Sequence, residues 1–194
     1  MVIRFTTFVL FALVLLPIKN ASAQAADTPW QIGVVNEDLT KIDTTVAVSN
    51  SGASSTIASP QNGAICVNVY ATSAPLSSIV ACCTCRVQAN ALRAFSVGKE
   101  VLVSVLPKAR TSVIKLLAST GTAGACNAST AGTGANVLVT GMLSWLVPAT
   151  SSSVAAVGKT SLNPATLSAA ELVSVTSQCA VLPNRACNST CSGP

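Results

Sequence analysis

The feature that most constrains this chain is its set of eight cysteines, three of which fall within four positions of the stretch IVACCTCRV. Those three are Cys82, Cys83 and Cys85, and the others are Cys66, Cys126, Cys179, Cys187 and Cys191. In an exported chain, an even number of cysteines is first of all a disulfide framework, and eight of them allow 105 connectivities. The cellular compartment therefore decides how these residues are interpreted.

The N-terminus has the order of a secretory signal peptide: an early arginine, an apolar run over residues 5–16, and the small-residue sequence ASA at 21–23. The run is shorter than the roughly 20 residues that a membrane-crossing helix needs. We therefore predict that residues 1–23 are a signal peptide, cleaved after Ala23 or alternatively after Ala25. The mature chain is predicted to be secreted or periplasmic, with no membrane span.

Composition predicts one β-rich domain over residues 24–194. Ala, Ser, Thr and Val dominate and aromatic residues are scarce, which suits sheets built from small β-branched side chains. Removal of Arg4 and Lys19 with the signal peptide lowers the formal net charge from +5 to +3, and no basic cluster is left. The sequence therefore gives no support to a nucleic-acid partner.

Short β-branched runs recur along the chain and predict an antiparallel β-sandwich, immunoglobulin-like or similar. The predicted strands are 30–37, 43–50, 64–71, 78–87, 92–97, 100–106, 111–119 and the apolar stretch 136–150. Gly, Ser and Pro content predicts loops at 51–63 and 120–135 and a turn at 72–77. In the third strand, Ile65, Val67 and Val69 alternate with Cys66, Asn68 and Tyr70, which is typical of a half-buried strand.

One C-terminal α-helix is predicted in LSAAELVSVTSQCAVLP, residues 167–183. Ser168 can cap its N-terminus, Glu171 has the spacing of a capping box, and Pro183 ends it. Its apolar face carries Leu172, Val175, Cys179 and Leu182. The tail that follows is too short to bury much surface, so we expect Cys187 and Cys191 to tie it to the domain.

Three stretches together resemble a group of exported, cysteine-rich bacterial proteins of unknown function. These are ICVNVY (65–70), CCTCRVQANALRAFSV (82–97), and LSAAELVSVTSQC (167–179) with the two cysteines that close the chain. The CC-x-C cluster is the distinctive motif. The resemblance implies export and a small disulfide-rich β-domain, and it implies no activity or substrate.

The chain has no histidine, which excludes Ser-His-Asp and Cys-His catalysis, mixed Cys/His zinc sites and imidazole bases. Glu37 and Glu100 could form a glycosidase pair, but solvated surface carboxylates are the simpler interpretation. Ser112 and Lys115 could form a catalytic pair, but a chain this rich in serine places the two residue types close together by composition alone. The glycines of 120–135 lack the Lys-Ser/Thr that follows a phosphate-binding loop. We therefore predict no catalytic residue, no cofactor and no metal site.

Two alternatives to disulfides stay open for the CC-x-C cluster. Four thiolates could hold zinc or an iron–sulfur cluster, or Cys83-Thr84-Cys85 could be a redox pair. The spacing lacks the two-residue gap of common metal knuckles, and export through an oxidising compartment disfavours both alternatives. Disulfide staples are the leading interpretation of all eight cysteines.

A hairpin between 64–71 and 78–87, turning at Ala74, would place Cys66 opposite Cys82 and predicts a Cys66–Cys82 bond. Alternation directs Cys82 outward with Thr84 and Arg86, and directs Cys83 and Cys85 toward the core with Ile79 and Val87. Cys83 and Cys85 should then bond to Cys179, Cys187 or Cys191, with Cys126 taking what remains.

These observations predict an exported, non-enzymatic, disulfide-stabilised β-domain that serves as a structural, surface or binding module. Its partner, a protein or a cell-surface component, is not identified by the sequence. The alternative is a thiol oxidoreductase or thiolate metal handler built on the CC-x-C cluster.

Overall fold

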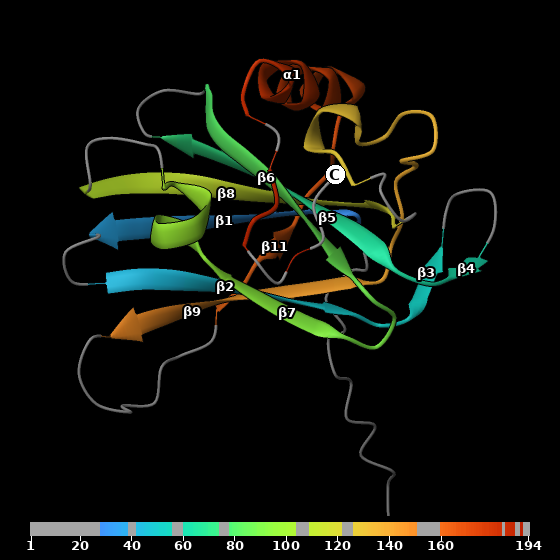
Figure 1. Ribbon diagram of the computed structural model, residues 1–194, viewed down its shortest axis with the longest axis horizontal. Helices are drawn as coiled ribbons and strands as arrows, with labels where there is room; N and C mark the ends of the chain where they lie inside the picture. Colours follow the sequence, from blue (N-terminus) through green and yellow to red (C-terminus); the bar gives the residue numbers. More distant parts are fainter. Residues whose placement is uncertain are drawn as a thin grey trace, which may run out of the picture.

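The computed structural model describes residues 28–38, 42–55, 60–73, 78–103, 109–121, 126–150, 160–183, 185–188 and 191. Over these residues the protein is mainly antiparallel β-structure, sandwich-like, with one α-helix, as predicted (Figure 1). Four disulfides staple this domain, which also agrees with the prediction. The predicted signal peptide, with both of its cleavage sites, lies outside the described residues.

The strands are β1 (Trp30–Asp38), β2 (Ile42–Asn50), β3 (Ala53–Ser55), β4 (Pro60–Asn62), β5 (Ile65–Ser73), β6 (Ile79–Val87), β7 (Leu92–Ser96), β8 (Ala109–Thr120), β9 (Met142–Thr150), β10 (Thr160–Ser161) and β11 (Asn163–Pro164). A π-helical turn, η1 (Val97–Val101), follows β7, and a 3₁₀ turn, η2 (Ala128–Thr130), precedes β9. The helix is α1 (Ala169–Ala180).

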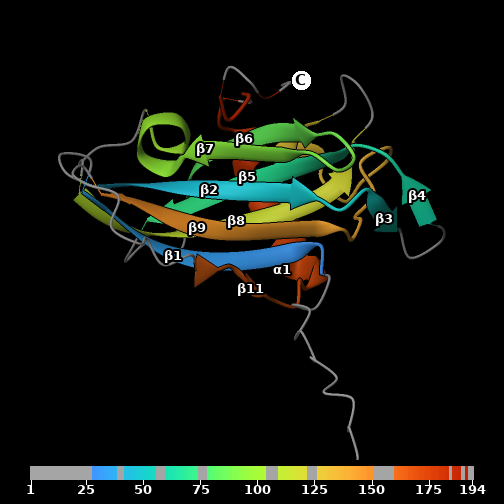
Figure 2. The same cartoon turned by 90° about the horizontal axis from the view of Figure 1, so that it is seen from below.

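Nine strands form one continuous sheet that folds back on itself at the β1–β2 link. Its order is β10-β9-β2-β1-β8-β5-β6, with β7 added to β2 and β11 added to β1. Because β1 and β2 pair only at Asp38 and Ile42, the sheet divides into two layers there. We call β1, β8, β5 and β6 the helix-covered layer, and β7, β2, β9 and β10 the open layer. Figure 2 looks onto the open layer, with the other layer and α1 behind it.

Two buried clusters hold this arrangement together. The interlayer core includes Val46 and Val48 of β2, Phe95 of β7, and Ile114 and Leu116 of β8. On the other side of the helix-covered layer, the helix-side core packs strand side chains against α1 and η2; it includes Trp30, Tyr70, Leu117, Ala128 and Val175. Each large apolar side chain buried in this way contributes about 1.5–3 kcal/mol.

The second cluster corrects one prediction about β5. Its side chains alternate as predicted, but every residue from Ile65 to Ser73 is buried, so the strand is not half-buried. The face of Cys66, Asn68 and Tyr70 is covered by residues 126–131 and α1 rather than by water. Sequence alternation gives the two faces of a strand, but it does not give what lies on each face.

Several predicted boundaries also change. The predicted loop 51–63 contains the short β3–β4 hairpin. The predicted strand 100–106 is wrong at its start, because Ser96 accepts a hydrogen bond from the Lys99 amide and begins the η1 turn there; residues 104–106 lie outside the described part. The predicted surface loop 120–135 buries Cys126, Ala128 and Ala131. The strand predicted at 136–150 begins only at Met142.

The predicted pairing of β5 with β6 is confirmed, but its register is wrong. Tyr70, not Cys66, lies opposite Cys82, and Cys66 lies opposite Arg86. The turn comes later than predicted because Thr72 and Ser73 continue the strand, paired on their other side with Val113 and Ser112 of β8. A shift by an even number of residues changes the partners and preserves the faces, so the predicted faces of the three cysteines of β6 are unchanged.

Candidate functional site

The CC-x-C motif lies in the middle of β6 and directs its cysteines to both faces of the strand. Cys83 and Cys85 belong to the interlayer core, and Cys82 belongs to the helix-side core. Their exposed fractions are 2% for Cys82 and 0% for the other two. The predicted faces of the three cysteines are confirmed, but Cys82 is covered by α1. The predicted face of Ile79 is wrong. Its side chain lies in the helix-side core with Cys82, not on the face of Cys83, because the strand pairing shifts between Ala71 and Thr72.

All eight cysteines form disulfides, in the pairs Cys66–Cys126, Cys82–Cys179, Cys83–Cys187 and Cys85–Cys191. The predicted Cys66–Cys82 bond is wrong, because the observed register separates those residues and Cys82 faces the helix instead. The prediction that Cys83 and Cys85 bond to the C-terminal region is confirmed, and Cys179 takes Cys82 as its partner.

Two of these disulfides fasten what we call the tail strap, residues 185–188 with Cys191, along the edge of β6. Ala186 forms a parallel bridge with Thr84. The Thr84 amide donates to the Arg185 carbonyl, and the Cys187 amide donates to the Thr84 carbonyl, both at 2.9 Å. The strap therefore lies along the free edge of β6 and is joined to it by one parallel bridge.

The tail strap also reaches the open layer. Arg185 donates to the Glu100 carbonyl at 2.8 Å and to the Val101 carbonyl, which are at the end of η1. Partial burial lowers the pKa of the Arg185 guanidinium, and an arginine side chain keeps its positive charge in proteins. Asn188 donates from Nδ2 to the Ala94 carbonyl of β7 at 3.0 Å. The strap thus closes the flank between β6 and β7.

The helix-side core carries the other two disulfides and a small polar network. Tyr70 donates from its hydroxyl to the Ala128 carbonyl at 2.7 Å, and burial raises its pKa. Lys115 pairs with Glu171 at 2.7 Å and lies 5.7 Å from the centre of the Trp30 ring. The predicted cap is confirmed, since Ser168 accepts from the Glu171 amide at 3.1 Å. The Glu171 carboxylate, however, bonds to Lys115 of β8.

On the opposite flank, residues 160–164 close the gap between β1 and β9. This seam segment pairs with β9 through β10 and with β1 through β11. Leu162, 2% exposed, enters the interlayer core between them. It packs against Gly33, where an added Cβ would lie 3.1 Å from Leu162 and from Leu146.

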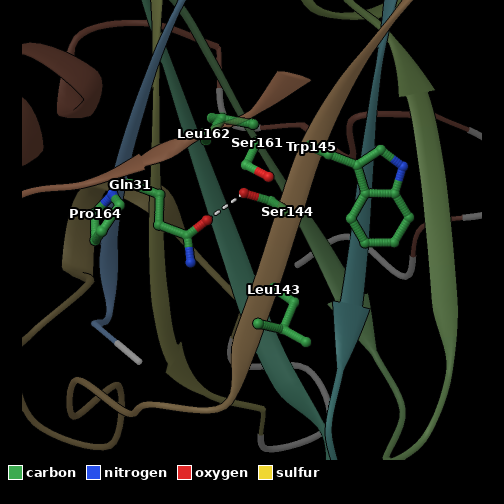
Figure 3. Close-up of a pocket in the computed structure, with 7 residues that line it drawn as sticks. All are labelled: Gln31, Leu143, Ser144, Trp145, Ser161, Leu162 and Pro164. Atoms are coloured by element: carbon green, nitrogen blue, oxygen red, sulfur yellow. Dashed lines mark hydrogen bonds between the residues drawn. The ribbon is translucent and has the colours of Figure 1, made fainter. Parts of the chain in front are cut away.

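A pocket of about 220 Å³ opens beside this seam segment (Figure 3). It is lined by Gln31, Leu143, Ser144, Trp145, Ser161, Leu162 and Pro164. At its base, Ser144 donates to Gln31 Oε1, and Gln31 Nε2 donates to the Met142 carbonyl at 2.8 Å. None of the seven lining residues is charged.

Sequence reasoning missed this pocket. One signal was available, because Gln31 occupies the strand face that otherwise carries Gly33 and Val35 toward the interlayer core. A polar side chain at such a position needs a buried partner, which β9 supplies as Ser144 and the Met142 carbonyl.

The catalytic pairs considered from the sequence are not assembled. Ser112 and Lys115 lie on opposite faces of β8, since Ser112 is buried toward the interlayer core and Lys115 meets Glu171. Glu100 accepts from the Ser96 amide, and Asp43 accepts from the Gly98 amide at 2.9 Å and from the Ser96 hydroxyl. The Glu37 side chain lies outside the described part of the chain.

Over the described residues, no cluster of His, Cys, Asp and Glu has the arrangement of a metal site. Among those same residues, no helix has both the length and the apolar character to cross a membrane. Comparison with family models, with curated proteins and with solved structures found no match. The resemblance to exported CC-x-C proteins therefore stays a prediction that rests on the residues quoted for it.

Proposed function

We propose that this protein is an exported, non-enzymatic binding or structural module whose eight cysteines serve only as staples. The observation that carries the proposal is the state of the CC-x-C cluster. Its three sulfurs are buried and bonded to three different distant residues, Cys179, Cys187 and Cys191. A thiol oxidoreductase needs an accessible, low-pKa cysteine that can attack a substrate disulfide.

The positions of the disulfides support a structural role. Cys82–Cys179 and Cys66–Cys126 fasten α1 and the segment before η2 over the helix-covered layer, and the other two fasten the tail strap across the β6–β7 flank. Each covering segment is short, and small exported domains use disulfides to hold such segments in place. Four disulfides are typical of proteins that fold in oxidising compartments.

Peptide mapping under non-reducing conditions, with a thiol count on the denatured protein, tests the proposal. We expect the four pairs given above, no free thiol, no bound zinc or iron, and no insulin reductase activity. Two or more free thiols within Cys82, Cys83 and Cys85, together with reductase activity or bound metal, would favour the thiol-based alternative.

Export is tested separately by intact-mass analysis of the protein from culture medium and periplasm. We expect a mature N-terminus at Gln24 or Ala26. Recovery of the uncleaved chain in the membrane fraction would contradict export.

A further inference from the structure

The four disulfides join cysteines in an order that the unfolded chain does not favour. Cys66, Cys82, Cys83 and Cys85 are the first four cysteines along the sequence, and no native bond joins two of them. Each bonds to a cysteine nearer the C-terminus, of which Cys126 comes first. Because a chain is made from its N-terminus, these four cysteines reach an oxidising compartment before any native partner does.

Loop closure in the unfolded chain favours wrong bonds of Cys66. This residue is about 16–19 positions from the three cysteines of the CC-x-C cluster, whereas 60 positions separate it from its native partner Cys126. The probability of closing a loop falls with about the 3/2 power of its length, so each short loop forms about six- to sevenfold more readily than the native one. The early bonds of Cys66 are therefore mostly non-native.

A Cys66–Cys82 bond is incompatible with the folded sheet. Cys66 lies opposite Arg86 in the β5–β6 pair, and Cys82 lies opposite Tyr70. Cys82 and Arg86 are four residues apart on β6, which places the Cα atoms of Cys66 and Cys82 about 14 Å apart. Two cysteines form a disulfide only when their Cα atoms lie within about 7 Å of each other. This bond must therefore break before β5 and β6 can pair.

Loop entropy also fails to select the native pairs at the C-terminal end. The three cysteines of the CC-x-C cluster bond across separations of 97, 104 and 106 residues to Cys179, Cys187 and Cys191. Any other matching of these two sets closes loops of about 94–109 residues, which changes the probability of closure by less than about 1.3-fold. The native matching is therefore decided by the packing of β6, α1 and the tail strap, and not by the unfolded chain.

A wrongly paired chain needs help from another molecule once its eight cysteines are oxidised. Exchange begins when a thiolate attacks a disulfide, and such a chain holds no thiol. The attack must also come before folding is complete, since the eight cysteines of the native structure are only 0–6% exposed. We propose that this chain is a substrate of a thiol–disulfide isomerase in the compartment to which it is exported. The inference rests on the proposed function, because it requires export and cysteines that serve as staples.

The exchange is balanced in electrons and needs no oxidant, as a chain with Cys66–Cys82 and Cys126–Cys179 bonds illustrates. The isomerase thiolate attacks the sulfur of Cys66, which forms a mixed disulfide and releases Cys82 as a thiolate. Cys82 then attacks Cys179, which closes one native bond and releases Cys126. Cys126 attacks Cys66 in the mixed disulfide, which closes the second native bond. The isomerase leaves as the thiolate that it was at the start.

The test re-oxidises the reduced, denatured mature chain, residues 24–194, with diamide as the only oxidant. After alkylation of any remaining thiols, peptide mapping gives the fraction of molecules with the four native pairs. We expect bonds of Cys66 to the CC-x-C cluster to dominate, and a native fraction at least about fivefold below that reached after reduced protein disulfide isomerase is added in catalytic amount. The same isomerase with its active-site thiols alkylated should restore nothing.

Cys66→Ala/Cys126→Ala is the matched variant, because it removes the early wrong bonds of Cys66 and lowers the possible connectivities from 105 to 15. Its native fraction with diamide alone should exceed that of the wild type several-fold. If this variant does not fold, the mapping of the wild type decides by itself. Native pairs in full yield with diamide alone, or equal yields with active and alkylated isomerase, would overturn the inference. Both results would leave four native disulfides in place, so the proposed function can stand when this inference fails.

Discussion

Removing the Cys66–Cys126 disulfide should destabilise the protein more than removing Cys85–Cys191, although the second bond spans far more of the sequence. The separations are 60 and 106 residues. If each bond acted alone, the longer loop would give the larger stabilisation, because a disulfide restricts the unfolded chain more when it closes a longer loop. The other disulfides reverse this order.

The reversal follows from how the bonds are nested. In the unfolded chain, the Cys83–Cys187 bond already holds Cys85 near Cys191, because Cys85 follows Cys83 by two positions and Cys191 follows Cys187 by four. The Cys85–Cys191 bond therefore closes a ring of only about eight residues. The loop-entropy relation then gives about 2.5 kcal/mol for Cys85–Cys191 and about 4 kcal/mol for Cys66–Cys126, which no other disulfide shortens. The expected difference is about 1.5–2 kcal/mol.

The assay compares the paired variants Cys66→Ala/Cys126→Ala and Cys85→Ala/Cys191→Ala by guanidinium denaturation without reductant. All four residues are 0–6% exposed, so the packing lost on truncation is similar in the two variants and largely cancels. Cys82→Ala/Cys179→Ala serves as a third point, because beside Cys83–Cys187 it closes a ring of about eleven residues and should cost about 2.8 kcal/mol. A cost that instead rises with sequence separation across the three variants would refute the nesting.

Three further changes test other parts of the structure. Ser168→Ala should cost about 1 kcal/mol in denaturant titration by removing the helix cap, and Ser177→Ala, an exposed position inside α1, should cost little; equal effects would contradict the cap. Leu162→Ala should cost about 2–5 kcal/mol by opening the seam, whereas Leu92→Ala, 56% exposed, should stay within about 0.5 kcal/mol, and similar costs would mean that Leu162 does not seal the core. Tyr70 is the only tyrosine, and burial raises its pKa above the ordinary 10.0, so native-state absorbance should show no phenolate at pH 10. Above pH 10 the unfolded phenol releases its proton while the folded one keeps it, so stability should fall by about 1.4 kcal/mol per pH unit, and a native titration near pH 10 would refute the burial.

The polar interactions that the sequence did not predict share one property, which is that their partners come from distant segments. The capping-box spacing predicts that Glu171 serves the helix cap, yet its carboxylate bonds to Lys115 on β8. The sequence places Gln31 in a strand without a side-chain partner, yet its amide is bonded to β9 across the seam. The capping spacing was visible because its two members are three residues apart, whereas 56 and 111 residues separate the other partners.

The sequence by itself determined the local features of this protein. The longer strands β1, β2, β5, β6 and β8, the helix with its Ser168 cap, and the faces of Cys82, Cys83 and Cys85 on β6 follow from alternation and capping within a few neighbouring residues. The disulfide partners, the β5–β6 register and the burial of both faces of β5 were decided only by the tertiary structure. Preferences for strand, helix and cap act within a single turn or strand. The partner of a cysteine instead depends on where α1, residues 126–131 and the tail strap pack against the sheet. That placement depends on the packing of both cores at once, so it cannot be read from any one segment.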